Sequence, residues 1–144
     1  MAVNIDKNKT DAFYRYKMPA ILTKVEGRGN GTKTVIVNLK QVSDSLNRPS
    51  EYLLKHLSYT LGSSAFYDRK NDRYILSGMH RASHVQVYVH NFIQRYVLCV
   101  MCNNPETVLE MKRVKIIKTC NACGHSAMIP SGDKLASYML KSLH

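Results

Sequence analysis

The sequence has 144 residues, of which 44% are hydrophobic, so it is long enough to bury a core of its own. Lysine and arginine number 21 against 10 acidic residues, and the resulting formal charge of +11 favours a polyanionic partner such as a nucleic acid. No apolar run approaches the length of a membrane span, and the polar residues 1–11 lack the apolar segment of a secretory signal, so we expect a cytoplasmic chain without membrane attachment.

Residues 1–13 predict a mobile N-terminal tail, because they offer too little apolar surface to order themselves. The tail runs into the sequence FYRYKMP at residues 13–19, where aromatic rings alternate with Arg15 and Lys17. An arginine at the root of a mobile tail could reach a partner. In the alternative interpretation, the rings anchor an edge strand and both cations simply face water.

Residues 21–26 and 33–38 predict a β-hairpin, because β-branched side chains alternate on both sides of a glycine-rich stretch. Glycines at the tip would allow positive φ angles and let a partner approach the backbone, and nearby cations would suit phosphate groups. An ordinary solvated turn is the alternative. A strand follows the glycines and no GK[ST] sequence is present, which disfavours a nucleotide-binding loop. The candidate contact residues are Lys24, Gly27, Arg28, Gly29, Asn30, Gly31 and Lys33.

Leucines at helical spacing predict helices over residues 39–46 and 50–61. Pro49 and Gly62 flank the second helix as start and stop signals. We interpret the leucines as core residues and Lys55 as solvent-facing. Two short helices joined by a tight turn also resemble a DNA-binding helix-turn-helix, although this pattern has low specificity.

A second hairpin and a third helix complete the predicted core domain, residues 14–97. The hairpin joins residues 64–67 to 73–76 through a turn with cations near its tip, and Arg73 lies beside that turn. Residues 83–96 carry an apolar stripe at helical spacing, although alternating valines there are also compatible with a strand. We therefore predict an α+β fold with a small mixed α/β core of two hairpins and helices.

The four cysteines of the chain form two CxxC pairs, which predict a structural zinc site. Two residues between the thiols let each pair turn tightly and aim both sulfur atoms inward, so that two pairs complete a tetrahedral shell suited to Zn²⁺. Four protein ligands leave no open position for water. Two redox motifs or a pair of disulfides are the alternative. The expected ligands are Cys99, Cys102, Cys120 and Cys123.

The sequence around the cysteines predicts a zinc ribbon over residues 98–130, because apolar residues alternate or cluster on both sides of a basic turn at residues 111–113. Residues 131–144 predict a short C-terminal helix whose Leu135, Tyr138 and Met139 face the protein. The histidines show no metal-ligand spacing, and no GxSxG elbow, Walker loop or clustered carboxylate pair occurs. Hydrolytic or redox catalysis by this chain is therefore not indicated.

The chain carries several linked motifs in a fixed order: FYRYKMP at residues 13–19, KVEGRGNG at 24–31 followed by Lys33-Thr34, LNRP at 46–49, NDRYI at 71–75, NPET at 104–107 and CNACG at 120–124. Together they resemble the N-terminal domain of the eukaryotic translation initiation factor 5 family. The likeness runs from near residue 1 to the last predicted helix. The first two motifs separate this family from the related β subunit of initiation factor 2.

This resemblance implies a GTPase-activating protein, itself not an enzyme, for the GTP-bound γ subunit of initiation factor 2. It would act on the small ribosomal subunit when the initiator tRNA meets the start codon of the mRNA. By the same likeness, Arg15 would be an arginine finger supplied in trans, because a planar, always charged guanidinium stabilises the charge that develops on the phosphates. Lys33 and Lys55 would dock the GTPase. The glycine-rich tip, and more weakly Arg73, would lie near the codon–anticodon helix or the tRNA.

Two other functions remain open. An RNA-binding module for start-site fidelity requires only the basic hairpin tips. A scaffold like the β subunit of initiation factor 2 requires the ribbon and a GTPase-docking surface. Only the activator requires Arg15. In each case we expect a monomer.

Overall fold

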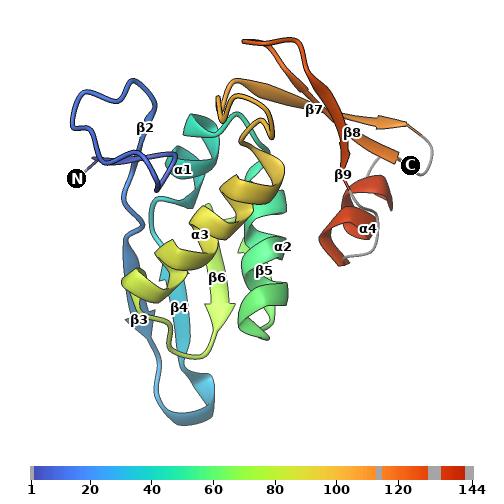
Figure 1. Cartoon of the computed structure of the whole chain (residues 1–144). Helices are drawn as coiled ribbons and strands as arrows, with labels where there is room; N and C mark the ends of the chain where they lie inside the picture. The colour runs from blue at the N-terminus through green and yellow to red at the C-terminus, as the bar shows by residue number, and fades with distance from the viewer. Residues whose placement is uncertain (1, 113–114, 130–133, 142–144) are drawn as a thin grey trace.

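The structure is a computed structural model that describes residues 2–112, 115–129 and 134–141. Its central layer is a sheet of four strands, β3 (Thr23–Glu26), β4 (Lys33–Ile36), β5 (Ala65–Asp68) and β6 (Arg73–Ser77). The strands are antiparallel in the order β3-β4-β6-β5. The helices of the core are α1 (Leu39–Ser45), α2 (Ser50–Leu61) and α3 (Ala82–Tyr96). In Figure 1, α2 and α3 lie in front of one face of the sheet, and α1 packs beside α2.

The predicted α+β class, both predicted hairpins and the three predicted core helices are confirmed. Helix α2 ends where its stop signal predicts, because Gly62 adopts a left-handed conformation with a φ of 65°. Helix α3 resolves the ambiguity of its valines: Val85 and Val89 are fully buried, whereas Val87 is 63% exposed. The helical period therefore prevails over the strand-like alternation. None of the described helices is long and apolar enough to cross a membrane.

The N-terminal segment differs from the predicted mobile tail. Strand β1 (Ala2–Asn4) pairs with β2 (Lys17–Pro19), and Ile5 is buried in the core. The Asn4 side-chain amide donates hydrogen bonds to the carbonyl oxygens of Lys9 and Asp11, at 2.8 and 3.0 Å. One buried isoleucine and these amide bonds close the loop between the two strands. Composition alone underestimates this order, because it does not register bonds from a side chain to the backbone.

The ribbon is a separate antiparallel sheet of β7 (Thr107–Lys112), β8 (Lys115–Cys120) and β9 (Ser126–Ile129) in that order. Its first two strands are predicted by the sequence, and β9 is an addition. Helix α4 (Lys134–Lys141) follows and packs against α2. Part of the predicted basic turn, residues 113–114, and the predicted start of the last helix, residues 131–133, lie outside the described residues.

One hydrophobic cluster joins the core, the ribbon and α4. Ile116 from β8, Ile129 from β9 and Met139 from α4 belong to the same buried cluster as the leucines of α1 and α2. The predicted boundaries between residues 14–97, 98–130 and 131–144 therefore do not correspond to separate hydrophobic cores. They remain predictions about domain organisation.

Two buried cations bridge the junction between core and ribbon. The Arg48 guanidinium donates to the carbonyl oxygens of Tyr96 and Thr107, both at 2.8 Å, and to the Thr107 hydroxyl at 2.7 Å. Burial lowers the pKa of Arg48 to about 10, so the side chain stays charged at neutral pH. The Lys118 ammonium donates to the carbonyl oxygens of Arg95 and Leu98. The LNRP and NPET motifs thus meet through Arg48 and Thr107.

Candidate metal centre, arginine segment and hairpin tip

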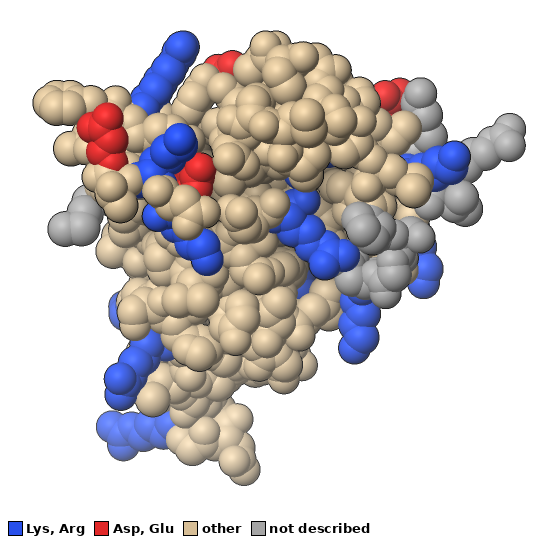
Figure 2. Space-filling view, in the orientation of Figure 1, with Lys and Arg blue, Asp and Glu red and all other residues tan. Residues whose placement is uncertain are grey.

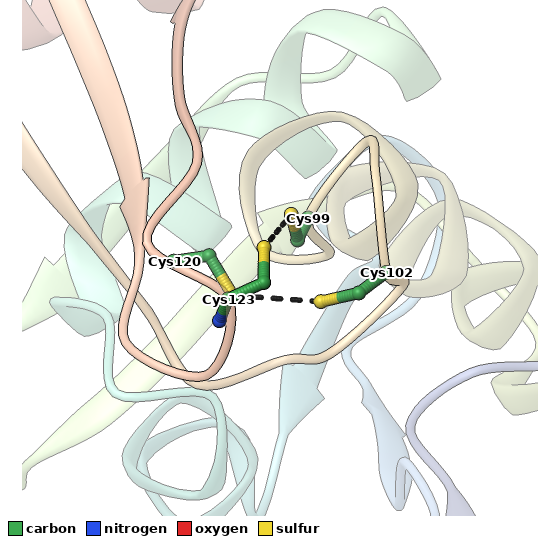
Figure 3. A group of neighbouring side chains, drawn as sticks. All are labelled: Cys99, Cys102, Cys120 and Cys123. Carbon is green, nitrogen blue, oxygen red and sulfur yellow. Dashed lines mark hydrogen bonds between the residues drawn. The ribbon is translucent and has the colours of Figure 1, made fainter.

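The four cysteine sulfur atoms form one cluster between the end of α3 and the ribbon. All four lie within 4.8 Å of one another and point toward a common centre (Figure 3). The shortest contacts cross between the two CxxC pairs, at 3.7 Å from Cys99 to Cys123 and 3.6 Å from Cys102 to Cys120. These separations are far longer than an S–S bond of about 2.05 Å. The cysteines are therefore arranged to share one metal ion.

The two CxxC pairs form matching turns, which we call knuckles. In the first, the backbone N–H of Asn103 donates to the Cys99 carbonyl; in the second, that of Gly124 donates to the Cys120 carbonyl, each at 2.9 Å. Both donors have positive φ angles, 57° for Asn103 and 79° for Gly124. Asparagine and glycine tolerate this conformation best, so each pair is followed by a residue suited to closing the turn.

Backbone N–H groups also point at the sulfur atoms. The amide of Met101 lies 3.4 Å from the Cys99 sulfur, and that of Ala122 lies 3.3 Å from the Cys120 sulfur. Burial opposes ionisation of Cys99, but the amides of Cys102 and Met101 outweigh it and lower the pKa of this thiol to about 7. Metal ligands must be thiolates, so this environment prepares the cysteines for coordination.

Four thiolates in a closed shell fit Zn²⁺, which would then have no open position for water or substrate. Such a site carries a net charge of about −2, because four thiolates contribute −4 and the ion +2. The buried ammonium of Lys118 lies near this centre, and the charges of Cys99 and Cys120 favour its protonated form even though burial lowers its pKa. The donor set and the nearby cation therefore both suit a tetrathiolate metal site.

The segment that carries Arg15, residues 13–17, is ordered and partly exposed. We call it the arginine segment. The Arg15 side chain is exposed, and its guanidinium carbon lies 5.5 Å from the centre of the Tyr16 ring. Tyr14 meets Tyr16 edge to face, with ring centres 5.8 Å apart. Phe13 is 91% exposed, although its backbone amide is held by the Asp11 carboxylate at 2.9 Å. Two rings thus anchor the segment while Arg15 and Phe13 face solvent.

The glycine-rich tip between β3 and β4 is exposed and contains a short 3-10 turn, η1 (Gly29–Gly31). Arg28 is exposed beside it. Lys24 and Arg73 already face an acidic partner: the Lys24 ammonium lies 3.9 Å from the Glu26 carboxylate, and the Arg73 guanidinium lies 2.6 Å from it. The hydrogen bond from Arg73 lowers the pKa of Glu26. Arg28 therefore offers the tip's most accessible positive charge among these three cations.

Substituting Gly27 with alanine should destabilise the hairpin, whereas the same change at Gly31 should be tolerated. Gly27 has a φ of 85°, and an added Cβ would lie 2.2 Å from the Gly31 carbonyl oxygen. A Cβ at Gly31 would meet nothing within 4 Å. We expect Gly27→Ala to lower the free energy of unfolding by about 1–3 kcal/mol, measured by urea denaturation. Equal stability of the two variants would contradict this geometry.

The residues that the sequence predicts as functional do not converge on one site. Figure 1 shows the glycine-rich tip at the bottom of the molecule and the segment between β1 and β2 at its upper left. Lys33 is the first residue of β4, next to the tip. Lys55 lies within α2, with its ammonium 5.3 Å from the centre of the Tyr138 ring. In Figure 2, lysine and arginine side chains are spread over the visible face rather than gathered in one cleft.

A family model for the domain found in initiation factors 2B and 5 matches residues 6–126. The chain belongs to this domain family. Among curated relatives, eukaryotic translation initiation factor 5 of Mus musculus is 46% identical over 144 residues, covering 99% of this chain and 34% of the relative. The protein of the same name from Saccharomyces cerevisiae is 41% identical over 143 residues, covering 99% and 35%.

The chain thus spans about a third of the length of these relatives. The predicted resemblance to the N-terminal domain of initiation factor 5 is confirmed by this coverage and identity.

In this member of the family, several residues contribute to the sites without having been singled out from the sequence. Asn103 and Gly124 close the knuckles, and a pattern of CxxC followed by asparagine or glycine could have identified them. Asn104 donates a hydrogen bond to the Tyr16 hydroxyl. This contact joins the NPET motif to the arginine segment across 88 positions of the chain, and no local pattern indicates it.

Proposed function

We propose that this domain acts in translation initiation as a GTPase-activating protein for the γ subunit of initiation factor 2. Its relatives are named eukaryotic translation initiation factor 5, and its motifs resemble the N-terminal domain of that family. It would act in trans on the GTP-bound partner, on small ribosomal subunits that have located a start codon. The chain itself would hydrolyse nothing.

The observation that carries this proposal is the exposed guanidinium of Arg15 on an ordered, ring-supported segment. Stimulating a GTPase in trans requires a cation that reaches the partner's phosphates without unfolding its own support. A guanidinium is always charged and presents several N–H donors in one plane, which suits the spread charge of the phosphoryl transition state. Arg15 meets these requirements because water is its only cover on the exposed side.

Other surfaces would hold the complex together. Lys33 and Lys55 would dock the GTPase through long-range attraction, each with a smaller effect than Arg15. The glycine-rich tip, residues 27–31, would approach the codon–anticodon helix and the initiator tRNA, with Arg28 meeting phosphate. Lys24 and Arg73 would contribute less to RNA contact, because both share the Glu26 carboxylate. A Zn²⁺ ion held by the four cysteines would fix the ribbon against the core.

Single-turnover GTP hydrolysis tests the proposal. Initiation factor 2 bound to GTP and initiator tRNA is placed on small subunits with an AUG-containing mRNA, and hydrolysis is followed with and without this chain. We expect strong stimulation with AUG and weak stimulation with a non-start codon.

Binding to the same complexes separates the other functions. Binding without stimulation would identify a scaffold. If binding depended on Arg28 and Lys33 but no stimulation occurred, the chain would be an RNA-contacting module instead.

A further inference from the structure

The arginine segment is linked to the first metal knuckle by a continuous series of contacts. The Arg15 guanidinium carbon lies 5.5 Å from the centre of the Tyr16 ring. The Tyr16 hydroxyl accepts a hydrogen bond from the side-chain amide of Asn104, at 3.3 Å. The carbonyl of Asn104 in turn accepts the backbone N–H of Cys99, at 3.0 Å. The contacts therefore lead from the exposed cation to a metal ligand in three steps.

Tyr16 is held from several sides, so its ring is a fixed support for the guanidinium. Its carbonyl accepts the backbone N–H of Ile5 at 3.0 Å, and Tyr14 packs edge-on against its ring. The ring is half-buried and contacts the hydrophobic core. A guanidinium over a tyrosine face gains a modest attraction, which restricts the rotamers of an otherwise exposed arginine. The ring can restrict Arg15 only while it is itself held in place.

The orientation of the Asn104 amide is determined by its second partner. The Asn104 side-chain oxygen accepts the backbone N–H of Glu106 at 2.8 Å. Because only the oxygen of this amide can accept, its NH₂ group must be the one that faces Tyr16. Asn104 also follows Asn103, whose N–H closes the knuckle on Cys99. A metal that fixes Cys99 would therefore fix the group that holds Tyr16.

We propose that Tyr16 and Asn104 are positioning residues for Arg15, and that they make the order of this arginine depend on the metal centre. The catalytic consequence rests on the proposed activator function. The structural consequence does not, because it concerns only the mobility of one side chain. Neither residue touches the reacting phosphates: Tyr16 restricts the guanidinium, and Asn104 restricts Tyr16.

NMR of the Arg15 side chain tests this relay without measuring activity. The rate of solvent exchange of the Arg15 Nε proton is compared in the wild type, Tyr16→Phe, Asn104→Ala and the double variant. Tyr16→Phe keeps the ring and removes only the hydroxyl that Asn104 binds. We expect faster exchange in both single variants and no further increase in the double variant, because both changes break the same hydrogen bond. Tyr88→Phe, a half-buried tyrosine on α3, is the matched control and should not alter Arg15.

Removing the metal with a chelator should accelerate the exchange in the wild type and add little in Asn104→Ala, where the link is already broken. Wild-type exchange in Tyr16→Phe and in Asn104→Ala would overturn the proposal.

Kinetics distinguish this proposal from the activator function. Tyr16→Phe should lower the maximal stimulated rate by about 2–10-fold, the loss expected for one hydrogen bond, and leave the half-saturating concentration unchanged. A shift in the half-saturating concentration alone would mean that Tyr16 serves docking and would overturn the positioning role. If the wild type itself gave no stimulation, the activator function would fail, and the exchange measurements would still decide the relay.

Discussion

Replacing Arg15 with alanine should lower the stimulated rate of GTP hydrolysis by about 10³ to 10⁵-fold, the range associated with an arginine supplied in trans. The loss should appear in the maximal rate, because a transition-state contact contributes little to binding of the ground state. Arg15→Lys should recover only a small part of the rate. An ammonium is a point charge and lacks the planar arrangement of donors that spans two phosphate oxygens.

The fold should not contribute to this loss. Arg15 is exposed and touches only the Tyr16 ring among the contacts described for it, so the free energy of unfolding should change by no more than about 0.5 kcal/mol. Arg81→Ala removes another exposed arginine, at the start of α3, and serves as the matched control. If Arg15→Ala and Arg81→Ala gave the same maximal rate as the wild type, the arginine-finger role would have to be assigned elsewhere.

Much of the fold follows from local patterns. Alternating β-branched residues on both sides of glycines predict the β3–β4 hairpin, and leucine spacing predicts α1 and α2. Each of these signals lies within a short stretch of chain, where one period or one turn residue decides the outcome. The CxxC pairs are equally local, and their clustering is confirmed by the structure.

What the sequence does not predict depends on contacts between distant segments. The order of the N-terminal residues rests on Asn4, whose amide closes a loop that composition suggests is mobile. The buried Arg48 is a surface cation by composition, yet it ends inside the molecule because three oxygen atoms of Tyr96 and Thr107 surround it. Such sites need the tertiary structure, since no hydrophobic period or turn signal indicates which distant oxygen atoms will be available.

The same limit applies to the candidate site. Sequence motifs identify Arg15, but they do not show that its support reaches the metal knuckle through Tyr16 and Asn104. Nor do they show that Arg73 is engaged by Glu26, which lies two strands away in the sheet. A cation's value for RNA binding depends on such partners, because an ion pair must be given up before phosphate is bound.

Removing the metal should destabilise much more than the ribbon. We expect freshly purified protein to contain one zinc ion per chain by elemental analysis. Chelation should lower the free energy of unfolding by at least about 3 kcal/mol, since the binding energy of a structural zinc is folding energy. The reason lies in the shared core: Ile116 and Ile129 of the ribbon pack with Met139 of α4, and α4 packs on α2. Loss of the knuckles would expose this junction.

Cysteine variants make the metal prediction specific. Cys99→Ser and Cys120→Ser remove buried ligands, one from each knuckle, and should reproduce the effect of chelation. Met101→Ser changes a residue of the same knuckle that is 70% exposed and is not a ligand, so it should leave the zinc content and the unfolding midpoint close to those of the wild type. Zinc-free protein with a wild-type midpoint would refute the structural role of the metal. If instead the ligand variants lost zinc and stability together while Met101→Ser did not, the tetrathiolate centre would be the element that holds the ribbon, α4 and the core in one fold.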